Sequence, residues 1–101
     1  MTILMKRLTK AKAEQLIQAF TQAALELDIV VRTERLTGAG GVPVSPGLAL
    51  VEDKWTIFLE KRQPPRERLA ALVAALDRFD LSKVELDETT AAYWAGSNPL
   101  L

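Results

Sequence analysis

The sequence predicts one α+β domain with three mostly antiparallel strands, two longer helices and a short C-terminal helix. Two segments have the apolar period of helices, and three short β-branched or alternating segments lie between them. A chain of 101 residues is one domain by length and can bury a single modest core. We therefore assign residues 1–101 to one domain, and we expect residues 97–101 to form a loose tail.

Residues 10–28 carry the first helical period. Apolar side chains recur at the spacing of one helix face, while glutamines and a glutamate fall on the other side. This predicted buried face consists of Ala13, Leu16, Ile17, Phe20, Ala24 and Leu27. Thr9 is the predicted N-cap, because its hydroxyl can accept a hydrogen bond from an otherwise unpaired backbone N–H.

Three strands are predicted between the helices. Residues 29–36 begin with β-branched side chains and then alternate. Residues 37–47 contain four Gly and two Pro, so this segment should be a loop away from any central strand. Residues 48–52 and 55–61 follow as two strands. Residues 53–54 are short enough to join them as a hairpin, although Asn-Gly or Asp-Gly is absent there.

The second long helix is predicted to begin at Pro64-Pro65, because proline suits the first helical turn. Leucines and a valine then fall on one face up to Phe79, and alanines fill the other faces. Residues 82–87 fit either a helix start or a short strand, with Asp87 as a second candidate start. Gly96 is a candidate residue after the last helical turn.

Composition restricts the chemistry that is open to this chain. Thirteen Lys and Arg balance thirteen Asp and Glu, which argues against nucleic-acid binding as a main role and against an electrostatic membrane anchor. His and Cys are absent, which removes imidazole and thiolate catalysis and the metal sites that these residues build. The longest apolar run has eight residues, whereas a membrane span needs about 20. We expect a cytoplasmic protein without enzymatic activity, cofactor, metal or membrane contact.

The Gly-rich segment is the candidate ligand or partner loop. Gly38, Gly40 and Gly41 resemble a phosphate-binding loop in composition, but the spacing matches neither the P-loop nor the dinucleotide motif. A connecting loop is the favoured interpretation. The alternative is a small-ligand or phosphate-binding protein or enzyme that uses this loop together with Arg62 and Arg66.

Charged residues suggest two further hypotheses, each weaker than its structural explanation. Four carboxylates near the end of the second helix could converge to bind Mg²⁺ or Ca²⁺. Their spacing does not match a calcium-binding loop, so they are predicted to be helix caps and solvated side chains: Asp77, Asp80, Asp87 and Glu88. Two basic groups would suit a nucleic-acid accessory protein, but no stacking aromatics accompany them: Lys6, Arg7, Lys10 and Lys12; Lys61, Arg62, Arg66 and Arg68.

Aromatic residues and alanines suggest an interface. Trp55 is expected in the core. Tyr93 and Trp94 are expected either to cap the core or to form a self-association patch. Small side chains on the second helix would let another helix approach closely: Ala70, Ala71, Ala74 and Ala75. The favoured function is therefore a non-enzymatic protein-interaction or self-associating domain, with a homodimer as one version.

Residues 55–79, WTIFLEKRQPPRERLAALVAALDRF, resemble the strand-turn-helix of zincin-type metallopeptidases that cleave repressors. In that family the helix carries H-E-x-x-H. Aligning Arg68 with the family's arginine places Ala74 and Ala75 at the first His and the Glu, and Arg78 at the second His. Alanine can neither hold zinc nor activate water, so the resemblance implies a packing helix without a metal. The Gly-Gly loop, hairpin and helix also resemble small uncharacterised bacterial proteins, which implies no particular activity.

Overall fold

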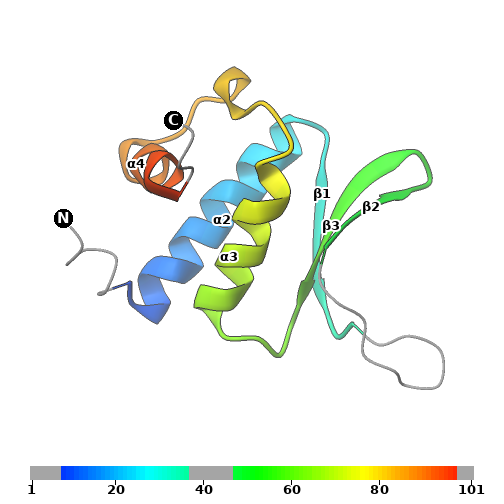
Figure 1. Cartoon of the computed structure of the whole chain (residues 1–101), viewed down its shortest axis with the longest axis horizontal. Coiled ribbons are helices and arrows are strands. Elements are labelled where there is room, and N and C mark those ends of the chain that lie inside the picture. Colours follow the sequence, from blue (N-terminus) through cyan, green and yellow to red (C-terminus); the bar gives the residue numbers. More distant parts are fainter. Residues whose placement is uncertain (1–7, 37–46, 98–101) are drawn as a thin grey trace.

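The structure is a computed structural model that describes residues 8–36 and 47–97. Its elements, in chain order, are α2 (Lys10–Glu26), β1 (Val30–Glu34), β2 (Gly47–Val51), β3 (Lys54–Glu60), α3 (Pro65–Leu76), the 3₁₀ helix η2 (Leu81–Lys83) and α4 (Glu88–Ser97). The predicted α+β class, with three strands, two longer helices and a short C-terminal helix, is confirmed (Figure 1). Ser97, the first residue of the predicted tail, belongs to α4, and the rest of that tail lies outside the described residues.

The sheet has the order β1-β3-β2 and is mixed. β2 pairs with β3 in antiparallel fashion, as predicted, but β1 runs parallel to β3, so the expectation of mostly antiparallel pairing was wrong for this pair. The reason is that β3, whose Ile57 and Leu59 are fully buried, takes the centre of the sheet, where it covers the most apolar surface. β1 therefore pairs with the second strand of the hairpin.

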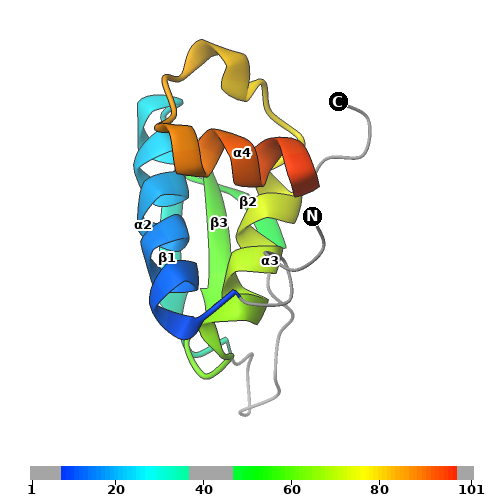
Figure 2. The same ribbon diagram turned by 90° about the vertical axis from the view of Figure 1, so that its left-hand side faces the viewer.

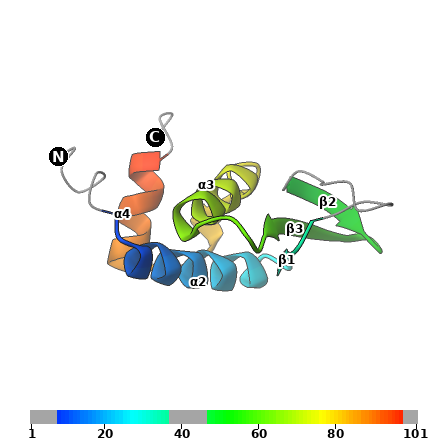
Figure 3. The ribbon, with the colours of Figure 1, turned by 90° about the horizontal axis from the view of Figure 1, so that it is seen from below.

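Both long helices cover the same face of the sheet (Figures 2 and 3). α2 contacts β1 and α3, while α3 contacts both β3 and β2. α4 lies on the side of the helix pair that faces away from the sheet (Figure 3). The chain thus forms a sheet layer, a layer of two helices and a short outer helix.

The core lies between the sheet and the two long helices. The predicted inner face of α2 is confirmed except at Leu27, which is half-buried, and Ala23 joins it. Seven large apolar side chains in this core are fully buried: Phe20, Ile29, Ile57, Leu59, Leu69, Leu72 and Leu76. Burial of each such side chain stabilises the fold by about 1.5–3 kcal/mol, which makes this cluster the main source of stability.

Side-chain caps and a proline mark where the helices begin. The hydroxyl of Thr9 accepts a hydrogen bond from the backbone N–H of Lys12 at 3.1 Å, which confirms the predicted cap. α3 begins at Pro65, and α4 begins after Asp87, whose carboxylate accepts from the backbone N–H of Thr90 at 2.8 Å. Residues 82–87 are therefore neither a strand nor a continuous helix, and Gly96 lies within α4 rather than after it.

Glu60 ties together the end of β1, the end of β3 and the turn that leads to α3. One carboxylate oxygen accepts from the backbone N–H of Leu36 at 3.1 Å and from the guanidinium of Arg62 at 2.9 Å. The other oxygen accepts from the backbone N–H and the Nε of Arg62, at 2.8 and 3.1 Å. The side-chain hydrogen bond from Arg62, followed by its backbone hydrogen bond, lowers the pKa of Glu60 from 4.5 to about 2.

We expect the free energy of unfolding of Glu60→Gln to fall less on acidification than that of the wild type. A carboxylate whose pKa is lowered in the folded state stabilises the fold above pH 4.5, and this contribution is lost as the pH falls towards about 2. The difference in free energy of unfolding between wild type and Glu60→Gln should therefore shrink across this range, as measured by urea denaturation at a series of pH values. Glu85→Gln, at an exposed glutamate, is the control. A wild-type minus Glu60→Gln difference that stays constant with pH would contradict this role.

Candidate functional site

The β2–β3 hairpin is joined by a two-residue turn at Glu52 and Asp53. Both residues have positive φ angles, 50° and 66°, as a type I′ turn requires. The predicted hairpin is confirmed, with its turn one residue earlier than predicted. This turn type matches the twist of the two strands, although neither residue is the Asn or Gly that favours it.

Replacing the turn by Asn-Gly, as Glu52→Asn with Asp53→Gly, should raise the free energy of unfolding by about 1 kcal/mol. The left-handed backbone is costly for Glu and Asp, and Gly relieves that cost. Thermal or urea denaturation would measure the gain. Glu52→Ala is the matched control, and it should not stabilise the protein, because alanine also disfavours positive φ. A loss of stability in the Asn-Gly variant would contradict the assigned turn.

Two large apolar side chains are exposed side by side on this hairpin. Leu50 is 56% exposed and Trp55 is 44% exposed, and they lie directly opposite each other in the β2–β3 register. The ring of Trp55 meets Phe79 edge to face at a centroid distance of 6.1 Å. With the half-buried Leu48, these residues form what we call the hairpin patch: Leu48, Leu50, Trp55 and Phe79.

The expectation that Trp55 belongs to the core was therefore wrong. Alternate residues of a strand point to the same face of the sheet, so Trp55 lies on the same face as Ile57 and Leu59, the face that the helices cover. α3, however, ends at Leu76, and the hairpin projects beyond the helices (Figure 1). None of the described helices thus covers the inward-facing side chains at the end of the hairpin.

Among residues 8–36 and 47–97, no strand pairs with one side of the β2 backbone. In a two-residue hairpin the residues flanking the turn, here Val51 and Lys54, form a hydrogen-bonded pair, and hydrogen-bonded pairs then alternate along the strands. The main-chain groups of Ala49 consequently point towards β3, and those of Leu48 and Leu50 point away from it. Within the described residues β2 is an edge strand, so these outward groups face no neighbouring strand.

The two edges of the sheet differ in charge. β1 carries Arg32 and Glu34, which form an ion pair at 3.0 Å, and Arg32 also lies over the ring of Phe58 at 5.6 Å. β2, with the sequence Gly-Leu-Ala-Leu-Val, has no charged residue. Charged side chains on an edge strand oppose pairing with another strand, so of the two edges formed by the described strands, β2 is the one without this protection.

The predicted ligand loop is only partly within the described residues. Gly38, Gly40 and Gly41 lie outside them. Arg62 is within them, but its guanidinium is held by Glu60, which compensates its charge. Arg66 is exposed in the first turn of α3. The structure therefore gives no joint site for these five residues.

The predicted interface residues are divided between surface and core. Ala70 and Ala74 are exposed on α3, Ala71 is half-buried, and Ala75 belongs to the core. Tyr93 and Trp94 are half-buried on α4, where their rings meet Phe20 at centroid distances of 6.2 and 5.8 Å. These aromatics thus dock α4 on α2, in line with the interpretation that they cap the core.

Two of the four predicted carboxylates, Asp80 and Asp87, act locally. Asp87 caps α4, and Asp80 accepts hydrogen bonds from the backbone N–H of Ser82 at 3.0 Å and from its hydroxyl. These hydrogen bonds lower the pKa of both carboxyl groups. Within residues 8–36 and 47–97, no group of three or more acidic residues could hold a metal ion.

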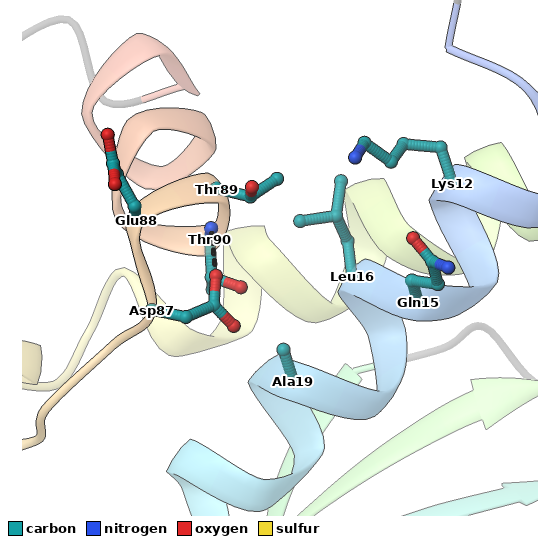
Figure 4. A pocket seen from close by; sticks show the side chains of 8 residues that line it. All are labelled: Lys12, Gln15, Leu16, Ala19, Asp87, Glu88, Thr89 and Thr90. Atoms are coloured by element: carbon teal, nitrogen blue, oxygen red, sulfur yellow. Dashed lines mark hydrogen bonds between the residues drawn. The ribbon is translucent and has the colours of Figure 1, made fainter.

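An open pocket of about 440 Å³ lies between α2 and the start of α4 (Figure 4). Four residues from each helix region line it: Lys12, Gln15, Leu16 and Ala19; Asp87, Glu88, Thr89 and Thr90. Figure 4 shows the side chain of Lys12 extending towards α4. One cationic side chain, Lys12, and two carboxylates, Asp87 and Glu88, line this opening, so its lining carries no cluster of positive charge that would bind an anion.

Sequence reasoning missed Leu50 and the outward backbone of β2. The available signal was the absence of any charge in residues 47–51.

None of the described helices is long and apolar enough to cross a membrane. Comparisons with protein-family models, with curated proteins and with solved structures found no match for this chain, so the resemblance of residues 55–79 to a peptidase helix stays a prediction.

Proposed function

We propose that this chain is a non-enzymatic protein-interaction domain that binds through the β2 edge and the hairpin patch. The observation that carries the proposal is the exposure of Leu50 and Trp55 next to a strand edge that is unpaired within the described residues. A folded protein seldom leaves a large apolar pair beside free main-chain donors and acceptors unless a partner covers both.

The chemistry of this surface suits an extended partner strand. Main-chain hydrogen bonds to Leu48 and Leu50 would provide affinity, and the apolar side chains would provide specificity through contacts with alternate residues of the added strand. Trp and Leu at the centre of such a contact exclude water, which strengthens the main-chain hydrogen bonds. The cytoplasmic location expected from the sequence belongs to the same proposal.

Site-specific photo-cross-linking in the native cell tests this proposal. A photoreactive residue at position 50 should give a protein adduct, whereas the same residue at position 25 should not. Leu25 is a matched control, because it is 59% exposed but lies near the end of α2 and outside β2. Equal adduct yields at the two positions, or no adduct at position 50, would contradict the proposed surface.

A further inference from the structure

We infer that the partner of the β2 edge is a second copy of this chain, with the two β2 strands paired antiparallel about a two-fold axis at Ala49. This inference rests on the proposed function and names its partner. It follows from three properties of β2: its outward hydrogen-bonding groups, its side-chain symmetry and the charges at its two ends.

The hydrogen-bonding groups select the register. With the axis at Ala49, Leu48 lies opposite Leu50 of the partner subunit, and both residues direct their main-chain groups outward. Each of the two Leu48–Leu50 pairs can then exchange both N–H···O=C hydrogen bonds. Moving the axis to Leu48 would carry Leu50 past Gly47 of the partner subunit, the first residue of β2, so Leu50 would lie opposite no residue of that strand.

Moving the axis the other way is also unfavourable. An axis at Leu50 would place Leu48 opposite Glu52 of the partner subunit, and Glu52 lies in the turn with a positive φ angle. Its main-chain groups no longer follow the strand. The register centred on Ala49 is thus the one in which both leucines find a strand residue of the partner.

The side chains are also self-complementary in this register. Residues 48–50 read Leu-Ala-Leu in either direction, so each leucine meets a leucine across a two-fold axis. Leu48 and Leu50 lie on the same face as Trp55, so the hairpin patches of the two copies become continuous. On the opposite face, Ala49 meets Ala49 of the partner subunit, and neither methyl group obstructs the contact.

Charge favours the antiparallel arrangement. The acidic turn residues Glu52 and Asp53 follow one end of β2, and the exposed Lys61 and Arg66 lie beyond the other end of the hairpin, after β3. Antiparallel pairing places the acidic turn of each copy near the basic end of the other copy. The end of β2 in one copy and the end of β3 in the other are then about two strand spacings apart, roughly 10 Å. Parallel pairing would instead bring the two acidic turns together.

Sedimentation equilibrium of the full chain with four sequences tests the inference. Wild type should be a concentration-dependent dimer. Leu50→Pro removes an outward N–H without removing a hydrogen bond to β3, and Leu50→Lys places a charge at the contact; each should raise the dimer dissociation constant by about 100-fold or more. Leu25→Lys makes the same change at an equally exposed leucine away from β2, and it should dimerise like wild type.

Circular dichroism of each variant confirms that the monomer is folded, and Leu50→Lys keeps the test valid if Leu50→Pro does not fold. A wild-type monomer at the highest concentration would overturn the second copy as partner. Dimers that survive both Leu50 changes would overturn the β2 register. A wild-type monomer that still cross-links to another protein through position 50 in cells would leave the proposed function in place, whereas the absence of any such adduct would overturn that function as well.

Discussion

Replacing Phe20 by alanine is expected to lower the free energy of unfolding by about 3–5 kcal/mol. Phe20 is fully buried in α2 and belongs to the core cluster. Its ring also meets the rings of Tyr93 and Trp94, so the change leaves a cavity and removes the contact that docks α4. We therefore expect α4 to loosen before the rest of the chain unfolds.

Urea denaturation followed by circular dichroism would measure the loss, and tryptophan fluorescence would report the change around Trp94. Leu25→Ala is the matched control on the same helix, because Leu25 is 59% exposed and should change the stability by less than about 0.5 kcal/mol. A Phe20→Ala protein with nearly unchanged stability would show that α4 and α2 do not share this core.

Ala75→Glu should lower the free energy of unfolding by at least about 2 kcal/mol, whereas Ala74→Glu should change it by less than about 0.5 kcal/mol. The two alanines are adjacent on α3, but Ala75 is 9% exposed and packs in the core, and Ala74 is exposed. A carboxylate at position 75 would lose water next to apolar neighbours, while one at position 74 stays hydrated.

Parallel denaturation of these two variants gives a direct comparison, since both carry the same substitution in the same helix. Similar losses at both positions would mean that α3 is rotated relative to its assigned orientation. A large loss at position 74 alone would mean that the exposed alanine face is covered in the folded protein.

The helices could be predicted from the sequence because their signals are local. The apolar period of α2, the hydroxyl of Thr9 and the proline at position 65 act over one or two turns, and each is found in its predicted role. The existence of the hairpin is also a local property of two short strands and a tight turn. The parallel pairing of β1 with β3 is not local, because it depends on which strand takes the centre of the sheet.

The candidate site could not be predicted from the sequence, because it depends on how far α3 reaches over the hairpin, and no local residue pattern encodes that. Whether Trp55 is buried depends on how far α3 extends over the hairpin, and α3 ends before it covers that position. The four alanines of α3 look alike in the sequence, yet the docking of α2 decides that Ala75 is buried and Ala70 is not. The absence of charge in β2 was visible, but only the strand order shows that this segment is an edge.

A single-cysteine variant tests the pairing of the two β2 strands most directly. The chain has no cysteine, so Ala49→Cys introduces one thiol at the proposed two-fold axis. There, Ala49 and Ala49 of the partner subunit form a non-hydrogen-bonded pair with Cα atoms roughly 4.5 Å apart, within the range that a disulfide bridges.

Mild oxidation of dilute Ala49→Cys protein should therefore give a disulfide-linked dimer that migrates at twice the mass of one chain until it is reduced. Thr33→Cys, at an exposed position on the β1 edge, should form no disulfide-linked dimer under the same conditions, although its unchanged β2 can still pair. Cross-linking at equal rates in the two variants, or none at position 49, would contradict the pairing of β2 with its copy.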